Sequence, residues 1–418
     1  MNDQPLPARD AALTILSHTA RQPALRMPLD DALDSVLAQD VVSPIDLPGR
    51  TNSAMDGYAV RATDIRGATA AAPVRLHVIE SIPAGRFPER TVGVGEAARI
   101  FTGAPLPDGA DSVVRQEDTD LGNATVTILR DRDAGVNIRL AGEDIRSGET
   151  VLRAGTALGP AELGVLASMA VAHPLVYRRP RVGILGGGDE IVDIDQPEEI
   201  LSGRKIASSN THTLMALVRR AGGEPVNLGI AGDTPDSVRA HVARGLDCDL
   251  IVTSAGISVG EHDHLRSVLE AMGIEHKFWK LRMRPGAPVG YGILADVPWI
   301  GLPGNPVSTM VTFELFVRPA IRQMCGHAEP FRSAVVARAA ERITLRPRLQ
   351  HFLRAVISER DDVLEARLTG PQGSGILTSM VRANALLVIP EGQHQTEPGA
   401  DVLAIRLDDP RHQQLPPF

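Results

Sequence analysis

The chain contains very little lysine. Only three of its 43 basic residues are lysine, namely Lys205, Lys277 and Lys280, and the others are arginine. A lysine that persists in such a chain is expected where a compact point charge is needed, because the planar guanidinium of arginine fills that role poorly. Chance survival of the three lysines is the alternative.

Cysteine and long apolar runs are scarce as well. Cys248 and Cys325 are the only cysteines and lie far apart, which argues against a disulfide framework and a zinc site and fits a reducing compartment. No apolar run approaches the roughly 20 residues that a membrane helix needs. Residues 1–22 lack the basic start and apolar core of a signal peptide. We therefore expect a cytoplasmic protein.

The charge of the chain argues against a nucleic-acid partner. The net charge is −8, and the basic residues are scattered without interleaved aromatic residues. Apolar residues make up 43% of the chain, which is enough for sizeable cores. Small molecules or other proteins are the expected partners.

The order of sequence patterns predicts a multidomain α/β protein. Over residues 180–327, short β-branched runs such as "RVGIL" and "DLIVTSAG" alternate with helical periodicity such as "SSNTHTLMALVRRAGG". This alternation is typical of a three-layer α/β domain with a mainly parallel sheet. Ligands of such sheets bind beyond the carboxyl ends of the strands.

Three further domains surround this α/β domain in our interpretation. Residues 8–40 and 161–170 show helical periodicity, whereas residues 46 to about 140 are rich in valine, glycine, proline and turn signals. The expected boundaries are a helical N-terminal domain (1–45 and 140–179), an inserted mostly-β domain (46–139), the α/β domain (180–327) and a C-terminal β domain (328–418).

The stretch "GLPGNPVSTM", residues 301–310, leaves an apolar run and enters a helical pattern at once. Asn305 suits the N-cap and Pro306 the first helical position. Such a helix N-terminus beside Gly304 attracts anions such as phosphate. A plain tight turn explains the same residues, and the stretch alone does not decide between the two.

Acidic residues follow several expected strands. Glu261 and Asp263 end "TSAGISVGEHDH", Asp189 and Glu190 follow the glycines of "GGGDEIV", and Asp233 follows "NLGIAG". Carboxylates beside glycine loops that favour anions predict a bound Mg²⁺, which takes one or two carboxylates together with phosphate oxygens. Each acid alone is also explained as a helix cap or a solvated turn residue.

Two other groups of polar residues are candidates for the site. Lys280, Arg282 and Arg284 alternate in "FWKLRMRPGAPVGYG" and would share one face of a strand. That face could bind an oxyanion, or it could keep an edge strand soluble. In and beside the inserted domain, polar loop residues are flanked by small residues. Their chemistry alone favours a role in turns over a role in a site, and they are Ser53, Asp56, Thr102, Glu143 and Asp144.

The motifs, taken in order, resemble one family. "NSAMDGYAV", "TGAPLPDGADSVV", "GEDIRSGE", "GDEIV", "SVGEHD", "RPGAPVGYG", "GLPGNPVS" and "GSGILTSM" are similar to segments of the molybdopterin molybdenumtransferases, the family that includes the gephyrin E domain. The resemblance runs from about residue 50 nearly to the end of the chain. It implies molybdenum cofactor biosynthesis, in which molybdate is inserted with Mg²⁺ into adenylylated molybdopterin and AMP is released.

The resemblance also implies an elongated homodimer with a site shared between subunits. The catalytic residues that the resemblance implies are Asp56, Asp144, Glu190, Asp233, Asp263 and Lys280. Of these, Asp233, Asp263 and Glu190 would hold the Mg²⁺. Asp56, Thr102 and Asp144 would come from the partner subunit, and Arg354 and Ser374 would face an oxyanion. The remaining substrate-binding residues implied are Ser53, Asp189, Gly256, Ser258, Gly260, Arg284, Pro288, Gly304 and Asn305. Expected protein partners are a molybdopterin adenylyltransferase and proteins that mature molybdoenzymes.

The sequence departs from the family pattern at a few positions. Gly186 and Gly187 stand where the family usually has a serine and a threonine, and Arg284 and Ala287 stand where it has lysines. Arg284 keeps the charge, whereas Ala287 removes a cation from the expected molybdate position. These departures permit a non-catalytic molybdopterin-binding scaffold as an alternative to the transferase. A molybdopterin adenylyltransferase, for which the α/β domain alone would suffice, is the other alternative.

Overall fold

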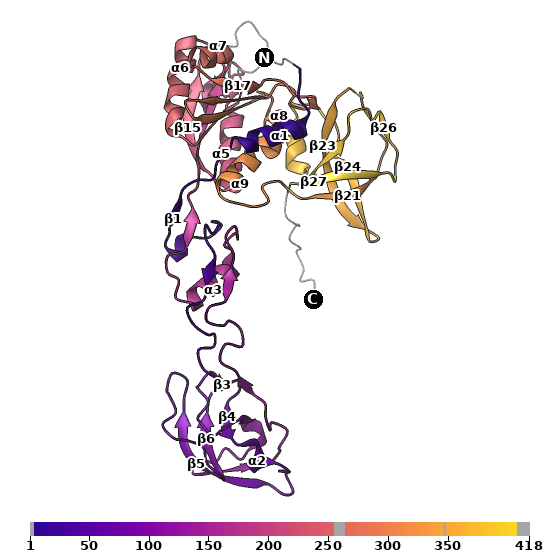
Figure 1. The fold of residues 1–418 in the computed structure, drawn as a ribbon. Coiled ribbons are helices and arrows are strands. Elements are labelled where there is room, and N and C mark those ends of the chain that lie inside the picture. The colour runs from indigo at the N-terminus through magenta and orange to yellow at the C-terminus, as the bar shows by residue number, and fades with distance from the viewer. Residues whose placement is uncertain (1–3, 255–263, 347, 408–418) are drawn as a thin grey trace.

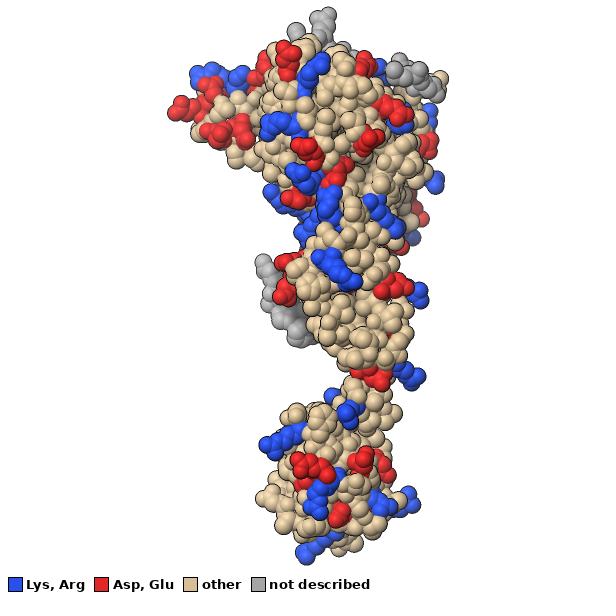
Figure 2. All heavy atoms as spheres, turned by 60° about the vertical axis from the view of Figure 1, so that its left-hand side comes forward, with Lys and Arg blue, Asp and Glu red and all other residues tan. Residues whose placement is uncertain are grey.

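The chain forms an elongated molecule whose two ends differ in architecture (Figure 1). The computed structural model describes residues 4–254, 264–346 and 348–407. An α/β unit and a C-terminal β unit lie side by side at one end, a small middle unit follows, and a β lobe forms the other end. Figure 2 shows that a narrow neck joins this lobe to the rest of the molecule. No helix among the described residues is both long and apolar enough to cross a membrane.

The α/β unit is built on a six-stranded sheet with the order β15-β12-β16-β20-β19-β17. The first four strands are parallel, and β19 is antiparallel to both of its neighbours. Val182, Ile184 and Ile251 of β12 and β16 are fully buried, as in a sheet covered on both faces. The strands are β12 (Arg181–Gly187), β15 (Glu224–Ala231), β16 (Leu250–Ser254), β17 (Glu275–Phe278), β19 (Gly290–Leu294) and β20 (Val297–Leu302).

Helices cover both faces of this sheet and complete the three layers that the sequence predicts. One face packs against α1, α5, α8 and α9, and the other against α6 and α7. The bounds are α1 (Ala8–Ser17), α5 (Ser209–Ala221), α6 (Pro235–Arg244), η3 (Gly245–Asp247), α7 (Leu265–Ala271), α8 (Pro306–Thr312), the π-helical η4 (Phe313–Val317) and α9 (Arg318–Met324). The multidomain α/β fold class is confirmed.

The prediction of helical structure over residues 8–40 is wrong beyond the first ten residues. The helix ends at Ser17, and a short strand and a 3-10 turn follow. Pro23 and Pro28 interrupt the region, because proline lacks the N–H that a helix interior needs. Ala11 and Ile15 of α1 are buried in the core of the α/β unit. The N-terminal helix therefore packs far from the middle unit that the next residues enter.

The middle unit is small and only partly helical. Its core holds Leu37, Leu158, Leu166 and Val176 between α3 and two pairs of short strands. The helix expected over residues 161–170 is confirmed as α3 (Pro160–Ser168). The other elements are β1 (Ala24–Arg26), η1 (Leu29–Asp31), β2 (Val41–Val42), β10 (Thr150–Leu152) and β11 (Leu175–Tyr177).

The β lobe is a five-stranded sheet with the order β7-β4-β6-β5-β8 and an apolar cluster on each face. Its elements are β3 (Asn52–Ser53), β4 (Gly57–Val60), α2 (Ala62–Ile65), β5 (Val74–Ile82), β6 (Glu96–Ile100), β7 (Ser112–Arg115), η2 (Gln116–Asp118), β8 (Thr125–Ile128) and β9 (Ile138–Arg139). We call residues 45–51 and 139–147 the neck. Its two segments are joined by a bridge between Leu47 and Ile145 and by a hydrogen bond from Ser147 N to Asp46 Oδ1 of 2.7 Å.

The C-terminal unit is a sheet that closes on itself. Its order is β18-β23-β24-β21-β27-β25, and β25 also pairs with β23. The first strand, β18 (Met283–Arg284), comes from the α/β region and joins the two units. The other elements are β21 (Ala334–Ala339), β22 (Ile343–Thr344), β23 (Gln350–Arg360), β24 (Val363–Leu368), α10 (Thr378–Arg382), β25 (Ala385–Ile389), β26 (Gln395–Thr396) and β27 (Asp401–Arg406).

Candidate functional site

A pocket of about 490 Å³ opens beyond the carboxyl ends of β12, β16 and β20. This is the edge at which parallel α/β sheets bind ligands. Four of the residues expected from the sequence line it, namely Glu190, Pro288, Gly304 and Asn305. The rest of the wall is made by Gly186, Gly187, Ile191, Ile206, Ala207, Ser208, Ser209, Asn210, Ser254, Pro303 and Pro306.

Two helices begin at this pocket. Asn305 is the N-cap residue of α8 with Pro306 at its first position, as expected, although the Asn305 side chain makes no capping hydrogen bond. The hydroxyl of buried Thr309 closes the turn instead, donating to Pro303 O at 2.6 Å. Asn210, at the start of α5, donates from Nδ2 to Gly304 O at 2.8 Å. The strand exit is thus braced by the neighbouring helix, with two helix N-termini beside one cavity.

Gly186 and Gly187, the last two residues of β12, form the floor of the pocket. A Cβ at Gly186 would lie 3.2 Å from Thr211 Oγ1, whose hydroxyl shares a hydrogen bond of 2.7 Å with Ser208 Oγ. Gly188 has a φ of +119°, and a Cβ there would lie 2.5 Å from Glu190 Oε2. Only glycine at position 188 lets the Glu190 side chain fold back in this way.

Asp189 and Asp233 hold each other in place. Asp233 N donates to Asp189 Oδ1 at 2.9 Å, and Asp189 N donates to Asp233 Oδ2 at 3.2 Å. The ammonium of Lys205, one of the three lysines, donates to Asp189 O at 2.6 Å. The structure therefore brings these two acids together at neighbouring strand ends.

The expected metal ligands are only partly visible. Asp263, together with Gly256, Ser258 and Gly260, lies outside the described residues, as does Glu261. Among the residues that the structure describes, no three histidine, cysteine, aspartate or glutamate side chains are grouped closely enough to hold a metal ion. Glu190 and Asp233 are the described members of the expected set.

The prediction that the basic residues of segment 280–284 lie on one strand is also wrong. Lys280, Arg282 and Arg284 do not share one strand, because β17 ends at Phe278 and β18 belongs to the C-terminal sheet. Leu6 bridges the gap by donating from N to Lys280 O at 3.0 Å and accepting from Arg282 N at 2.8 Å. The three side chains are still exposed while Leu281 and Met283 between them are buried. Arg282 pairs with Glu391 at 3.4 Å.

The backbone segment that carries Lys280 runs next to a residue of the pocket wall. Leu281 N donates to Ala287 O at 2.8 Å, which places this chain segment beside Pro288. No hydrogen bond or ion pair of the Lys280 ammonium occurs within the described part of the chain. Among the described residues its charge therefore has no partner.

Arg354 and Ser374 contribute from the C-terminal unit. Arg354 is fully buried, and its guanidinium donates to Ser379 Oγ at 3.1 Å and to Gly373 O at 2.9 Å. Burial lowers its pKa. Ser374 O accepts from Val307 N in the first turn of α8 at 3.1 Å. Arg354 thus supports the loop that carries Ser374 to the start of α8.

The candidate residues of the lobe and the neck lie at the other end of the molecule. Thr102 donates to Asp56 Oδ1 from both N and Oγ1 at 2.8 Å, and these bonds lower the pKa of Asp56. The buried Ser53 hydroxyl donates to Met55 O at 2.5 Å and so holds the turn before Asp56. Glu143 Oε2 accepts from Leu140 N at 2.8 Å. Asp144 is exposed.

These lobe and neck residues do not reach the pocket of their own chain. None of them lines it, and Figure 1 shows β3 and β4 separated from the α/β unit by the middle unit. The candidate site residues therefore form two groups. One lies at the sheet edge of the α/β unit, and the other lies in the lobe and the neck.

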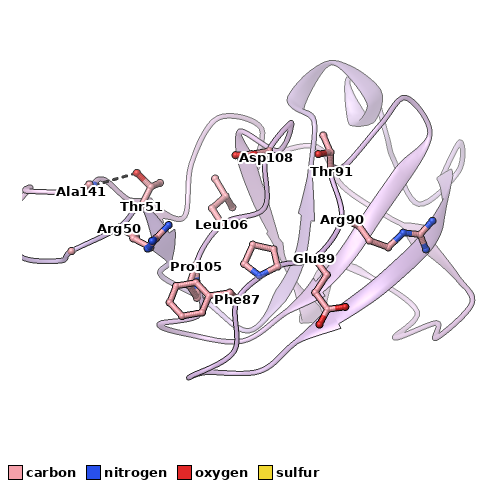
Figure 3. Close-up of a pocket in the computed structure, with 12 residues that line it drawn as sticks. Arg50, Thr51, Phe87, Glu89, Arg90, Thr91, Pro105, Leu106, Asp108 and Ala141 are labelled. Carbon is pink, nitrogen blue, oxygen red and sulfur yellow. Dashed lines mark hydrogen bonds between the residues drawn. The ribbon is translucent and has the colours of Figure 1, made fainter.

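A second pocket, of about 530 Å³, lies between the neck and the lobe (Figure 3). Thr51 Oγ1 accepts from Ala141 N across the neck at 3.2 Å, and Arg50 lies 4.9 Å from the centre of the Phe87 ring. This pocket also carries Glu89, Arg90 and Asp108. It lacks the convergent strand ends and paired helix N-termini of the first pocket.

Sequence reasoning did not identify several pocket residues, among them Ser208, Ser209 and Asn210. The signal was present, because these polar residues stand at the N-cap and the first two positions of α5. Such a cluster predicts the start of a helix and not a ligand site. Its position beside Gly304 depends on the packing of α5 against α8 and could not be read from the sequence.

Comparison with known proteins places this geometry in a wider group. Three family models match the chain one after another. They are the MoeA N-terminal region (domain I and II) over residues 6–170, a probable molybdopterin binding domain over residues 183–323, and the MoeA C-terminal region (domain IV) over residues 336–407.

Curated relatives and solved structures extend the similarity over most of the chain. A molybdopterin molybdenumtransferase of Nostoc sp. is 37% identical, with 89% of this chain and 86% of the relative covered. A molybdopterin molybdenumtransferase 2 of Mycobacterium tuberculosis is 40% identical, with 88% and 91% covered. The crystal structure of the molybdopterin biosynthesis moeA protein from Pyrococcus horikoshii aligns with a TM-score of 0.81 at 29% identity, covering 97% of this chain and all of that one.

Proposed function

This chain belongs to the family of the molybdopterin molybdenumtransferases, and on that premise we propose that it inserts molybdate into adenylylated molybdopterin and releases AMP. The observation that carries the proposal is the pocket at the carboxyl ends of β12, β16 and β20. It combines two helix N-termini and a glycine floor with adjacent carboxylates, which suits a phosphate-bearing substrate that binds with a cation.

The substrate's phosphates would lie over the floor of the pocket. Gly186 and Gly187 allow close approach of the backbone, and the starts of α5 and α8 present a positive electrostatic potential to an anion. Asn210 and Asn305 offer amide groups at the same edge. These residues bind and orient, and they hold the phosphoanhydride beside the acidic residues.

Mg²⁺ is the cofactor that the acidic residues suit. Glu190, which lines the pocket, and Asp233, fixed by Asp189, supply hard carboxylate oxygens, and Asp263 would complete the set. Bound Mg²⁺ would neutralise the negative charge that develops when the phosphoanhydride breaks. Lys205 keeps the loop of Asp189 and Glu190 in position through its contact with Asp189 O.

In the reaction, an oxygen of water or of molybdate forms a bond to phosphorus while the bridging P–O bond between the two phosphates breaks. If molybdate is the nucleophile, a P–O–Mo link forms, and its Mo–O bond must break as molybdenum passes to the pterin. One phosphate leaves as AMP, and the other stays on molybdopterin. Lys280 and Arg284, both exposed, and Ser374 on the loop held by Arg354 would bind the oxyanion. This is charge-assisted binding of an anion by positioned donors.

The second group of candidate residues requires a second copy of the chain. Asp56, Thr102 and Asp144 do not reach the pocket of their own subunit. We propose that they meet the pocket of the partner in a homodimer. The two groups of residues then form one site across the dimer interface, together with Ser53 as the support of the Asp56 turn.

The direct test is incubation of the protein with adenylylated molybdopterin, Mg²⁺ and molybdate, with AMP quantified by chromatography. We expect AMP release that requires both Mg²⁺ and molybdate. Release of pyrophosphate from ATP and molybdopterin, without AMP release, would instead identify an adenylyltransferase. No AMP at any molybdate concentration would overturn the proposal.

One observation favours a second candidate, a non-catalytic molybdopterin-binding scaffold. Ala287, which accepts a hydrogen bond from Leu281 N and directly precedes Pro288, carries no charge. A protein that only holds the pterin would bind adenylylated molybdopterin with the same pocket and leave it intact. Binding measured by calorimetry, with no AMP formed, would support this candidate.

A further inference from the structure

A buried pair of hydroxyl groups, those of Ser208 and Thr211, lies next to the floor of the pocket. Ser208 follows β14 (Ile206–Ala207), lines the pocket and is 4% exposed, and Thr211 lies in the first turn of α5 and is 2% exposed. The two hydroxyl oxygens are 2.7 Å apart. Ser208 N donates to the carbonyl oxygen of Val192 in the paired strand β13 (Ile191–Val192) at 2.9 Å. The pair is therefore held at the point where α5 begins.

Neither hydroxyl makes the hydrogen bond that its position in the helix predicts. A serine at the N-cap usually accepts a backbone N–H of the first turn, but the Ser208 side chain makes no capping hydrogen bond. A threonine inside a helix can donate to a carbonyl of the preceding turn, as Thr309 and Thr312 do in α8. Within the described part of the chain, the Thr211 hydroxyl bonds only to that of Ser208. Formation of the helix therefore does not explain the pair.

The hydrogen bonds of the pair leave one hydroxyl hydrogen over. Two hydroxyls carry two donor hydrogens, and the hydrogen bond between them uses only one. If Ser208 donated, the remaining hydrogen would belong to Thr211, which is buried and is not among the described residues that line the pocket. A buried donor without an acceptor costs free energy, which favours Thr211 as the donor. The Ser208 hydrogen is then free to donate to a group that fills the pocket.

Gly186 leaves the space in front of the pair open. A Cβ at position 186 would lie 3.2 Å from Thr211 Oγ1 and 3.6 Å from Ser208 Oγ. A serine side chain there would therefore bring its own hydroxyl to this part of the floor. This chain has glycine at position 186, where the family usually has serine, and the hydroxyl beside this position belongs to Ser208 instead.

A phosphate oxygen is the acceptor that this hydroxyl suits. Among the described residues that line the pocket, Glu190 is the only charged side chain, and no lysine or arginine occurs. A phosphate bound there depends on neutral donors, such as the backbone N–H groups at the starts of α5 and α8. A hydroxyl that donates to an anion forms a charge-assisted hydrogen bond, which is stronger than one between neutral groups.

We propose that Ser208 donates its hydroxyl hydrogen to a phosphate oxygen of the substrate, and that Thr211 is the positioning residue that donates to Ser208 Oγ. The proposal rests on the proposed function, which places the phosphates over Gly186 and Gly187. Ser208 binds the phosphate directly, whereas Thr211 acts only through Ser208. The pair therefore distinguishes AMP from adenosine, because only AMP carries the phosphate.

Calorimetric titration of the full chain with AMP and with adenosine tests the contact without turnover. Ser208→Ala should weaken AMP binding about tenfold, the size expected for a hydrogen bond to a charged group, and leave adenosine binding unchanged. Thr211→Val keeps the shape of the side chain and should weaken AMP binding several-fold, because Ser208 loses the bond that orients it. The matched control is Ser168→Ala, an exposed serine of α3 whose hydroxyl donates to Val165 O at 2.8 Å.

A double variant tests whether the place of the hydroxyl matters. Gly186→Ser combined with Ser208→Ala returns a hydroxyl to this part of the floor and should recover AMP affinity. Unchanged AMP affinity in Ser208→Ala overturns the proposal. An equal loss of AMP and adenosine affinity in that variant, or a wild type that binds both ligands equally, overturns it as well.

AMP binding and AMP release are separate measurements. A protein that shows the expected loss of AMP affinity but releases no AMP from adenylylated molybdopterin contradicts the proposed transferase activity alone. A protein that releases AMP while Ser208→Ala binds AMP normally contradicts the hydroxyl contact alone.

Discussion

At the residue scale, the acidic edge of the pocket is held by backbone contacts more than by cations. Asp189 and Asp233 each accept the other's backbone N–H, and Lys205 holds Asp189 through its carbonyl oxygen. Both carboxylates keep lone pairs free beyond these bonds, because a carboxylate has about four acceptor positions. In the proposed function, these free lone pairs are the ones that would bind Mg²⁺.

Replacement of Asp233 by asparagine tests this role. If Asp233 and Asp263 help to hold Mg²⁺ at the phosphoanhydride, either replacement should slow AMP release at least about tenfold, which corresponds to roughly 1.4 kcal/mol of barrier. Substrate binding should change less, and a higher Mg²⁺ concentration should partly restore the rate. Asp236→Asn, an exposed acid in the first turn of α6, is the matched control. Normal AMP release by both the Asp233 and the Asp263 variants would mean that these acids only cap helices or turns.

A second residue-scale prediction concerns the oxyanion. Ala287 lacks the cation expected there, and loss of a charge-assisted contact weakens anion binding by about 1.5 to 3 kcal/mol. We expect Ala287→Lys to lower the molybdate concentration for half-maximal AMP release several-fold without changing the maximal rate. Ala271→Lys, at an exposed position of α7, controls for added charge. An unchanged titration would mean that Arg284 or Lys280 already supplies the contact.

At the element scale, the sequence predicted what local patterns determine. Buried β-branched runs gave β12, β16 and β20, and Asn305 with Pro306 gave the start of α8. Predictions failed where distant segments decide the pairing. Leu6 and Gln350 draw residues 281–284 away from the central sheet, and nothing near these residues in the sequence indicates that. The positions of Ser208 and Asn210 depend on helix packing in the same way.

The end of α9 makes a pH prediction at this scale. Burial, and then the positive charges of Arg322 and Arg318, lower the pKa of His327 to about 4 from an ordinary value near 6.5. Arg322 Nη2 lies 3.1 Å from His327 Nδ1, and Nδ1 of a neutral ring can accept a hydrogen bond from it. The unfolded chain therefore binds a proton between pH 6.5 and 4 that the folded chain refuses. Folding stability should fall as the pH drops through this window, by up to about 1.4 kcal/mol per pH unit.

His327→Asn should remove this part of the pH dependence. Denaturant unfolding of the wild type and the variant at pH 7.5 and pH 5 measures it, and the wild type should lose more stability between the two values. The exposed His173→Asn is the control and should behave as the wild type does. Equal losses in all three proteins would assign the acid sensitivity to other groups.

At the scale of the whole molecule, the elongated shape keeps the candidate site residues of one chain in two separate groups (Figure 1). The middle unit separates the neck, with Asp144, and the lobe, with Asp56 and Thr102, from the α/β unit that holds the pocket (Figure 1). The sequence placed these residues in different domains but gave no distances, and only the resemblance suggested a shared site. A closed two-fold dimer makes two equivalent sites from such halves.

Mixing two inactive variants tests this shared site. Asp144→Asn damages the residues that a subunit contributes to the site of its partner. Asp233→Asn damages the residues that it contributes to the site at its own α/β unit. A mixed dimer then contains one site with both lesions and one with none. With random subunit exchange half of the dimers are mixed, so AMP release should recover to about a quarter of the wild-type rate. Sites confined to one chain would show no recovery on mixing, and each variant alone, refolded in the same way, sets the baseline.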